Sequence, residues 1–203
     1  MKANQMNEIF DQCIADYHKE DHVDTSENNP FAEGSFENLL YHKNWIDTVQ
    51  WHLEDIIRDP NIDAEHALVI KRRIDTSNQD RTDLVEKIDD WYLNNFGEGE
   101  VKENARVNTE SPAWAIDRLS ILALKIYHMR VEAERTDVHA ELQHKNQFKL
   151  NVLLTQRKDL SLAIDQLIED LENGNRIMKV YRQMKMYNDP DLNPVLYAKK
   201  NDA

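Results

Sequence analysis

The segment 112–129, PAWAIDRLSILALKIYHM, is the most apolar stretch of the chain, and it limits the fold more than any other stretch. At about 100° per residue its apolar side chains cover two sides of a helix, and such a helix belongs at the centre of a bundle. Asp117, Arg118 and Lys125 interrupt it before the ~18 apolar residues that a membrane span needs. We therefore expect a buried central helix and no membrane span.

The composition favours long helices that are joined by few turns. Only 4 Gly and 5 Pro occur among 203 residues, whereas helix formers such as Leu, Ala, Glu and Lys are plentiful. We predict an all-α fold, in which a single domain over 1–203 has about five long helices around the central one. Loops are expected at about 20–35 and 97–111, the second mobile or acting as a lid, and an extended tail at 188–203.

The charge excludes some classes of partner. The 25 Lys and Arg residues against 38 Asp and Glu residues give a formal net charge of −13, which repels nucleic acid and anionic membrane surfaces. The one cysteine, Cys13, cannot form an internal disulfide and has apolar neighbours, as a core side chain does. The N-terminal segment lacks the pattern of a signal peptide, so we expect a reducing, cytoplasmic setting.

Hydrophobic periodicity and N-cap residues place the helices. We predict helices at 3–19, 35–58, 63–97, 111–137 and 139–187, the last interrupted at Asn173-Gly174. In the second helix the core stripe is expected to be Ile46, Val49, Leu53, Ile56 and Ile57. A separate polar stripe of the same helix holds Asp47, Trp51, Glu54 and Arg58, with Asn44 and Asp55 on its edge. A tryptophan among charges is unusual for a face that only meets water.

The last helix carries a repeat with alternating spacings of four and three, which is typical of a coiled-coil seam. Its members are Asn146, Leu150, Leu153, Arg157, Leu160, Ile164, Leu167 and Leu171. This seam predicts a homo-oligomer, or a partner protein, that docks through the last helix.

Two arginines occupy core-stripe positions on different helices, Arg81 in the third and Arg157 in the last. A buried guanidinium needs a partner, because stranding the charge costs ~3–5 kcal/mol. The partners that we expect are Glu54, Asp55, Glu86, Asp89 and Asp117. The pattern leaves two interpretations open: a structural ion-pair network, or an internal pocket where arginines hold a phosphate or carboxylate.

The ligand-binding set that this pattern predicts combines the polar stripe with the two arginines and a histidine beside an apolar face. It comprises Trp51, Glu54, Arg58, Asn78, Arg81, Asp117, His128 and Arg157. His52 and His128 both stand on strongly patterned helices, where a histidine is more often a hydrogen-bonded core residue than a catalyst. No residue is assigned a catalytic role.

Carboxylates suggest a metal site as an alternative. Glu86 and Asp89 lie at i and i+3 on one helix face, and Glu54 and Asp55 could face them from the preceding helix. Such oxygen ligands suit Mg²⁺ or Mn²⁺. The arrangement resembles the all-helical nucleoside triphosphate pyrophosphohydrolases, which pair a Glu-x-x-Glu helix with a Glu-x-x-Asp helix, but the first motif is absent because position 57 is isoleucine. Carboxylates at this spacing are also common on helices that only meet water.

Four strings resemble a bacterial family of unknown function whose members are about as long as this chain. They are LLYHKNWIDTVQWHLEDIIR, IKRRIDTSNQDRTDLVEKID, SPAWAIDRLSILALKIYHM and KVYRQMKMYNDPDLNPVLY. The family's Trp-His-x-Glu-Asp-x-x-Arg is met by Trp51, His52, Glu54, Asp55 and Arg58, whereas His42 and Asn44 stand one residue closer together than in its pattern. The resemblance implies an all-helical fold, a bacterial origin and an association with cell-envelope glycosyltransferases. It implies no established activity and no catalytic residues.

Three functions remain open at this point. The first is a binding or accessory module in which Arg81 and Arg157 converge on a small phosphorylated ligand, such as a sugar phosphate or nucleotide sugar. The second is a phosphohydrolase that uses Mg²⁺ or Mn²⁺ on the four carboxylates, with Arg81 or Lys71 facing the leaving group. The third is a structural protein that associates through the seam of the last helix.

Overall fold

The computed structural model describes residues 1–97, 99–184 and 192. Over this part of the chain the structure has five α-helices, no strand, and one isolated β-bridge between Arg106 and Arg176. The helices are α1 (Ala3–Tyr17), α2 (Phe36–Ile57), α3 (Ala64–Phe96), α4 (Pro112–Glu134) and α5 (Ala140–Glu172). The predicted all-α fold is confirmed. No helix among the described residues is both long enough and apolar enough to cross a membrane.

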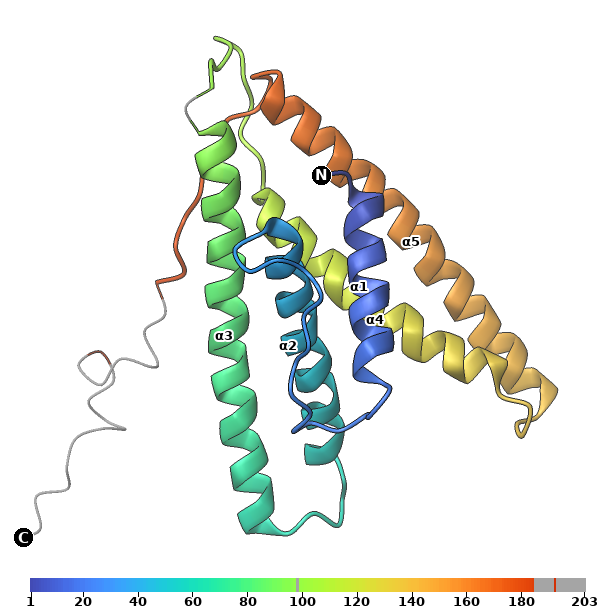
Figure 1. The fold of residues 1–203 in the computed structure, drawn as a ribbon. Helices are drawn as coiled ribbons and strands as arrows, with labels where there is room; N and C mark the ends of the chain where they lie inside the picture. The colour runs from blue at the N-terminus through green and yellow to red at the C-terminus, as the bar shows by residue number, and fades with distance from the viewer. Residues whose placement is uncertain (98, 185–191, 193–203) are drawn as a thin grey trace, which may run out of the picture.

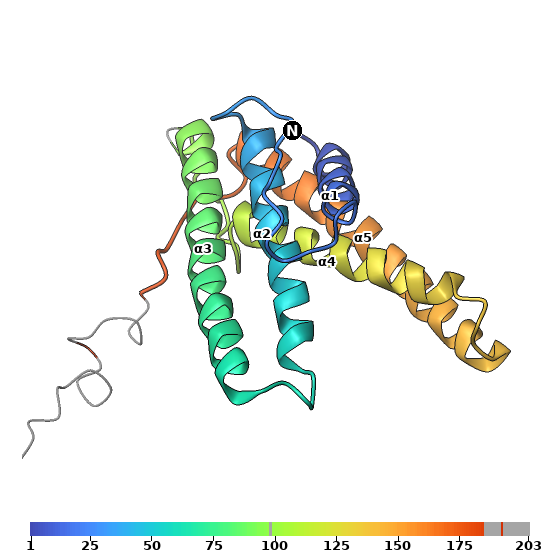
Figure 2. The ribbon, with the colours of Figure 1, turned by 60° about the horizontal axis from the view of Figure 1, so that its bottom comes forward.

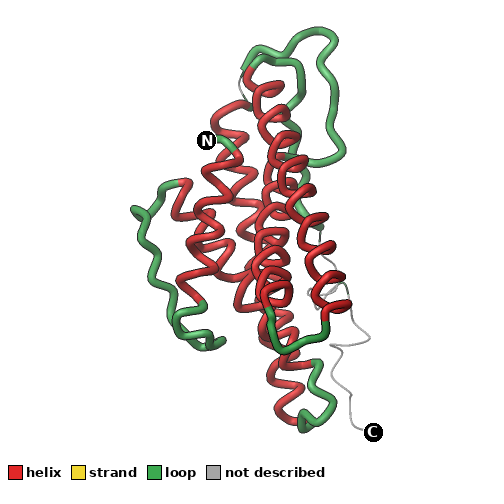
Figure 3. Tube along the Cα trace, turned by 90° about the vertical axis from the view of Figure 1, so that its right-hand side faces the viewer, coloured by secondary structure: helices red, strands yellow, loops and turns green. Residues whose placement is uncertain are grey.

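The helices form two antiparallel pairs. Figures 1 and 2 show α2 beside α3, and α4 beside α5, with the second pair crossing the first at an angle. The connections 58–63 and 135–139 are short, which makes consecutive helices neighbours. The helix α1 packs on α2 and α4, and its Ala3 N–H donates to Asp165 Oδ1 on α5 at 2.8 Å. In the side view of Figure 3 the loops connect the helices at their ends.

The helix starts are set by the residues that the sequence predicts for these positions. Ser35 Oγ accepts a hydrogen bond from Asn38 N, and Asp63 accepts one from His66 N, so both are N-caps. Pro112 is the first residue of α4. An N–H at this position has no partner within the helix, so the absence of one in proline costs no hydrogen bond. The last helix ends at Glu172 and does not resume in 175–184, contrary to the predicted continuation to 187; residues 185–187 lie outside the described part.

The central helix is buried as predicted. Ile116, Leu119, Ala123 and Leu124 of α4 are at most 1 % exposed and join one apolar core with residues of all four other helices. Cys13 is part of this core, and its thiol donates to Tyr41 O at 3.3 Å. Burial raises the pKa of that thiol, with Glu27, Asp16 and Asp47 adding to the shift, so Cys13 is an unreactive core side chain.

Part of the buried surface of α2 is polar, which was not predicted from the sequence. Lys43, Asn44 and Thr48 are 0 % exposed and Asp47 is 4 % exposed. The predicted core stripe is only half-buried apart from Leu53. The predicted stripes are therefore wrong in part: Lys43, Asn44 and Asp47 contact α4, and the aliphatic side chains pack around the edge shared with α3. Asp55 and Arg58 of the predicted polar stripe are exposed.

The seam of α5 is used inside the chain. Leu150 packs with Leu122 and Ile126 of α4, and Ile164 joins the main core. Association of two copies through the last helix therefore stays a prediction, for a surface that α4 already covers in part.

The loop after α3 is tied to the segment after α5. Lys102 N donates to Gly174 O, Arg106 N to Asn175 O, and Ile177 N to Arg106 O, each at 3.0 Å. These bonds fasten the segment 99–106, which the sequence predicted as a mobile loop or a lid. In this structure it is part of a strap that joins the ends of two helices.

Candidate functional site

A cluster of charges lies where α2, α3 and α4 meet. The buried ion cluster consists of Lys43 and Asp47 on α2, Arg81 on α3 and Asp117 on α4. Lys43 stands one turn before Asp47, so its ammonium group contacts the Asp47 carboxylate on the same helix. The same ammonium lies 2.5 Å from Asp117 Oδ1. One lysine thus joins carboxylates from two helices.

The same two aspartates hold Arg81. Its Nε donates to Asp47 Oδ1 at 2.6 Å, and its Nη2 donates to Asp117 Oδ1 at 3.2 Å. Burial opposes the charge, but the Asp47 and Asp117 carboxylates outweigh it and hold the pKa of Arg81 above its usual value. The sequence predicted that Arg81 is paired and named Asp117 among the partners, whereas Asp47 was not named as one.

Neutral side chains complete the cluster. Ser120 Oγ donates to Asp47 Oδ2 at 2.6 Å, and Asn44 Nδ2 donates to Ser120 Oγ at 2.8 Å. The two cations balance the two carboxylates, which lowers the cost of burying all four charges. On the α3 side, Gln50 accepts from Ser77 Oγ and donates to Asn78 Oδ1, each at 2.9 Å, so the predicted ligand residue Asn78 lies next to this network.

A cleft of about 310 Å³ opens over the cluster. Its lining contains Asp47 and Arg81 of the buried ion cluster together with Gln50, Trp51, Glu54, Asp55, Arg58, Ile121 and Leu124. Arg58 donates to Glu54 Oε2 at 3.1 Å and to Asp55 Oδ1 at 3.3 Å at the exposed rim. The structure therefore brings together four of the predicted ligand residues as lining, Trp51, Glu54, Arg58 and Arg81, with Asp117 behind Arg81.

Arg157 lies elsewhere. Its Nη1 donates to both carboxylate oxygens of Asp11 on α1, at 3.1 Å each, and its side chain is 21 % exposed. The predicted convergence of Arg81 and Arg157 on one cavity is wrong. The reason is the crossing of the two helix pairs, which turns this part of α5 toward α1 and not toward α3.

The four predicted metal carboxylates are also separated. Because α2 and α3 are antiparallel, Glu54 and Asp55 at the end of α2 lie beside the start of α3, whereas Glu86 and Asp89 lie near the end of α3. Glu86 accepts from Gln183 N at 3.1 Å, and Asp89 is buried near Ser111. The predicted Mg²⁺ or Mn²⁺ site is therefore wrong for these four residues, which do not form a group in the described part of the chain.

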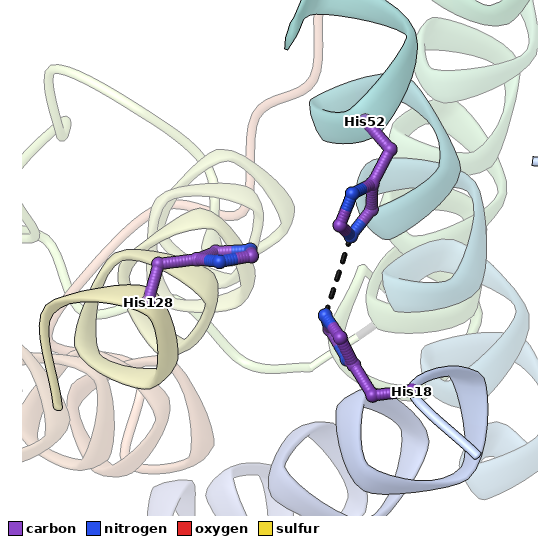
Figure 4. A group of neighbouring side chains, drawn as sticks. All are labelled: His18, His52 and His128. Atoms are coloured by element: carbon purple, nitrogen blue, oxygen red, sulfur yellow. Dashed lines mark hydrogen bonds between the residues drawn. The ribbon is translucent and has the colours of Figure 1, made fainter. Parts of the chain in front are cut away.

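Three histidines do meet. The histidine cluster consists of His18 just after α1, His52 on α2 and His128 on α4, with one ring nitrogen of each within 4.8 Å of the others (Figure 4). Among the described residues, this is the group of side chains whose ligand atoms lie close enough together to hold a metal ion. Burial first, and then the nearby His52 and His18, lower the pKa of His128 to about 4, so its imidazole is neutral at pH 7.

Lys43, Ser120 and His18 are not among the site residues predicted from the sequence. Lys43 carries one available signal, its spacing of four residues from Asp47, but an i, i+4 ion pair is usually a surface feature. Nothing in the sequence brings His18 to α2 and α4, because it follows the end of its helix and precedes a loop.

A family profile described as "protein of unknown function (DUF4254)" matches residues 37–180. The chain belongs to the DUF4254 family. The matched range contains the buried ion cluster, the cleft and two of the three clustered histidines of this DUF4254 protein, whereas His18 precedes it. No curated protein and no solved structure matches the chain.

Proposed function

We propose that the protein is a binding module that takes up a small phosphorylated, hydroxyl-rich ligand in the cleft over the buried ion cluster. Arg81 carries the proposal. Its guanidinium lines the cleft, while Asp47 and Asp117 fix it through Nε and Nη2. Neither bond uses Nη1, and a guanidinium held in one orientation binds phosphate oxygens at a low cost in side-chain entropy.

The rim of the cleft supports a ligand that has both an anionic group and hydroxyl groups. Arg58 pairs with the half-buried Glu54 and the exposed Asp55, and pairs near the surface are weak in water, so a ligand phosphate can replace them. Glu54 and Asp55 are then free to accept hydrogen bonds from hydroxyl groups. Trp51 adds an aromatic wall against which a sugar ring can pack.

The charge of the cleft limits how many phosphate groups a ligand can carry. Three cations, Lys43, Arg58 and Arg81, stand against four carboxylates in the buried ion cluster and the rim. The set therefore has a net charge of −1, and a diphosphate would meet more repulsion than a monophosphate. A sugar monophosphate fits the charges better than a nucleotide sugar does.

The setting that we propose is the bacterial cytoplasm, in a role linked to cell-envelope glycan synthesis. The resemblance described above supports the bacterial origin and the link to glycans. The single Cys13, which is buried and unpaired, suits a reducing compartment.

Calorimetry and thermal shift against sugar monophosphates test this function, with the unphosphorylated sugars and inorganic phosphate as comparisons. We expect the sugar monophosphates to raise the thermal midpoint and bind one per chain. The Arg58→Ala variant should bind about 10-fold more weakly, because it loses one charge-assisted contact. Arg130→Ala, exposed on α4, serves as the control and should bind normally. No shift by any sugar phosphate at millimolar concentration would contradict the proposal.

A further inference from the structure

The histidine cluster has the geometry of an unassembled metal site. His18 Nε2 and His52 Nε2 lie 3.3 Å apart. A tetrahedral Zn²⁺ ion with bonds of ~2.0–2.1 Å separates its nitrogen ligands by ~3.3–3.4 Å. Two of the three histidines therefore stand at the spacing of ligands that share one ion. Figure 4 shows the His128 ring pointing into the space beside them.

The hydrogen bonds of His18 direct its Nε2 toward the other histidines. Its Nδ1 lies 2.7 Å from Ile14 O, and a carbonyl oxygen can only accept, so Nδ1 carries the proton. Its Nε2 forms a hydrogen bond with His52 Nε2, which a shared metal ion would replace. Zinc-binding histidines typically donate their second ring nitrogen to a carbonyl or carboxylate in this way.

His128 supplies a second, independent observation. Its Nε2 is buried and has no hydrogen-bond partner in the structure. A buried polar atom without a partner costs ~1–3 kcal/mol, and in a native protein it calls for a water or an ion. Its ring orientation is fixed, because the ring stacks on Trp51 with the planes 5° apart.

A carboxylate, that of Asp21, lies beside two of the three histidines. Asp21 Oδ1 lies 3.7 Å from His52 Nε2 and 3.9 Å from His18 Nε2. Asp21 has φ = 52°, and its N–H donates to Tyr17 O, which is the left-handed position that ends a helix. Glycine would adopt this backbone without strain, whereas aspartate places a carboxylate toward the imidazoles.

We propose that His18, His52 and His128 form a binding site for one Zn²⁺ ion, with Asp21 as the fourth ligand. The neutral nitrogen ligands and the carboxylate suit Zn²⁺ better than Mg²⁺ or Ca²⁺, which prefer oxygen. The three nitrogens lie within 4.8 Å of one another, so the site requires a closure of at most ~1.5 Å to reach the ligand spacing given above. It joins the end of α1 to α2 and α4, and it is independent of the sugar phosphate proposal.

The test is metal binding by the full chain without a histidine tag, after dialysis against a chelator. We expect one Zn²⁺ per chain by calorimetry, and a Co²⁺ complex with the strong visible absorption of tetrahedral coordination. Loss of a residue that only hydrogen-bonds to a metal ligand typically weakens metal binding by roughly 10–100-fold. His52→Ala and His128→Ala each remove a ligand, so each should weaken Zn²⁺ binding by more than that. Asp21→Asn should weaken it less, and it should change the Co²⁺ spectrum.

His66→Ala is the matched control, because His66 is exposed on α3 and outside the cluster. It should bind Zn²⁺ as the parent chain does. Circular dichroism confirms that each variant is folded, and His52→Gln provides a polar replacement if the alanine variant unfolds. The proposal would be overturned if the parent chain bound no Zn²⁺ at micromolar concentration. It would also be overturned if a folded His18→Ala/His52→Ala chain bound Zn²⁺ equally well.

Discussion

The rings of Trp51 and His128 stack with their planes 5° apart and their centroids 4.8 Å apart. The two residues belong to different helices, α2 and α4, and both line an apolar pocket of about 430 Å³ beside Phe148. Trp51 also lines the cleft over the buried ion cluster, and His128 belongs to the histidine cluster. One aromatic pair therefore stands between the proposed ligand cleft and the proposed zinc site.

The first prediction concerns the lysine at the centre of the buried ion cluster. In the Lys43→Met variant the carboxylates of Asp47 and Asp117 lose a cation that is 0 % exposed, and Arg81 alone remains to balance them. Breaking a buried ion pair on one side typically costs ~3–5 kcal/mol. We expect the free energy of unfolding, measured by urea denaturation, to fall by about that amount.

Two further variants isolate the electrostatic part of that loss. Lys87→Met changes an exposed lysine on α3 and should shift stability by less than about 0.5 kcal/mol. Adding Asp117→Asn to Lys43→Met removes one of the stranded carboxylates, so the double variant should be more stable than the sum of the single losses predicts. Additive losses would show that Lys43 contributes through packing and not through its charge.

The helix starts could be predicted from the sequence because their causes are local. Ser35, Asp63 and Pro112 act on their own first turns, and the structure places each start within a residue of its predicted position. The central position of 112–129 could also be predicted, because its apolar surface is too wide to cover in any other way.

The orientation of α2 could not be predicted by the same reasoning. Its aliphatic stripe predicts one buried face, but Lys43 and Asp47 are buried because Arg81 and Asp117 neutralise them from two other helices. Such compensation depends on tertiary contacts that hydrophobic periodicity does not record. The histidine cluster has the same character, since its members lie on three segments far apart in the chain.

The second prediction concerns the strap between the ends of α3 and α5. Gly174 has φ = 65°, and a Cβ atom at this position would lie 2.2 Å from Glu100 O. Gly174→Ala should therefore lower the free energy of unfolding by more than the ~1–2 kcal/mol of backbone strain, because the strap must also move. The amides of Lys102, Arg106 and Ile177, which form the strap's hydrogen bonds, should then exchange faster with deuterium.

Gly34 offers a control for backbone strain alone. Its φ is 81°, but a Cβ atom there would meet nothing within 4 Å. Gly34→Ala should show only the ~1–2 kcal/mol of strain and should leave hydrogen exchange in the strap unchanged. Equal effects of the two substitutions would mean that the contact with Glu100 yields without cost.

The third prediction concerns the pH dependence of stability that Asp89 causes. Its carboxyl group is buried beside the start of α4, and its Oδ1 has no hydrogen-bond partner in the structure. Burial raises the pKa of Asp89 above its ordinary value of 3.8, although Ser111 and Arg182 act in the opposite direction. The folded state therefore binds a proton more tightly than the unfolded state does.

The sign of the effect follows from this difference in proton binding. The contribution of Asp89 to stability is fully present below pH 3.8 and is lost as the pH rises through the raised folded pKa. Asp89→Asn cannot ionise, so it should be more stable than the parent chain at pH 7, and its advantage should shrink as the pH falls toward 4. Urea denaturation of both chains between about pH 4 and pH 7 measures this difference. Asp80→Asn, exposed on the same helix, should show no comparable trend, and an advantage of Asp89→Asn that grows at low pH would contradict the assignment.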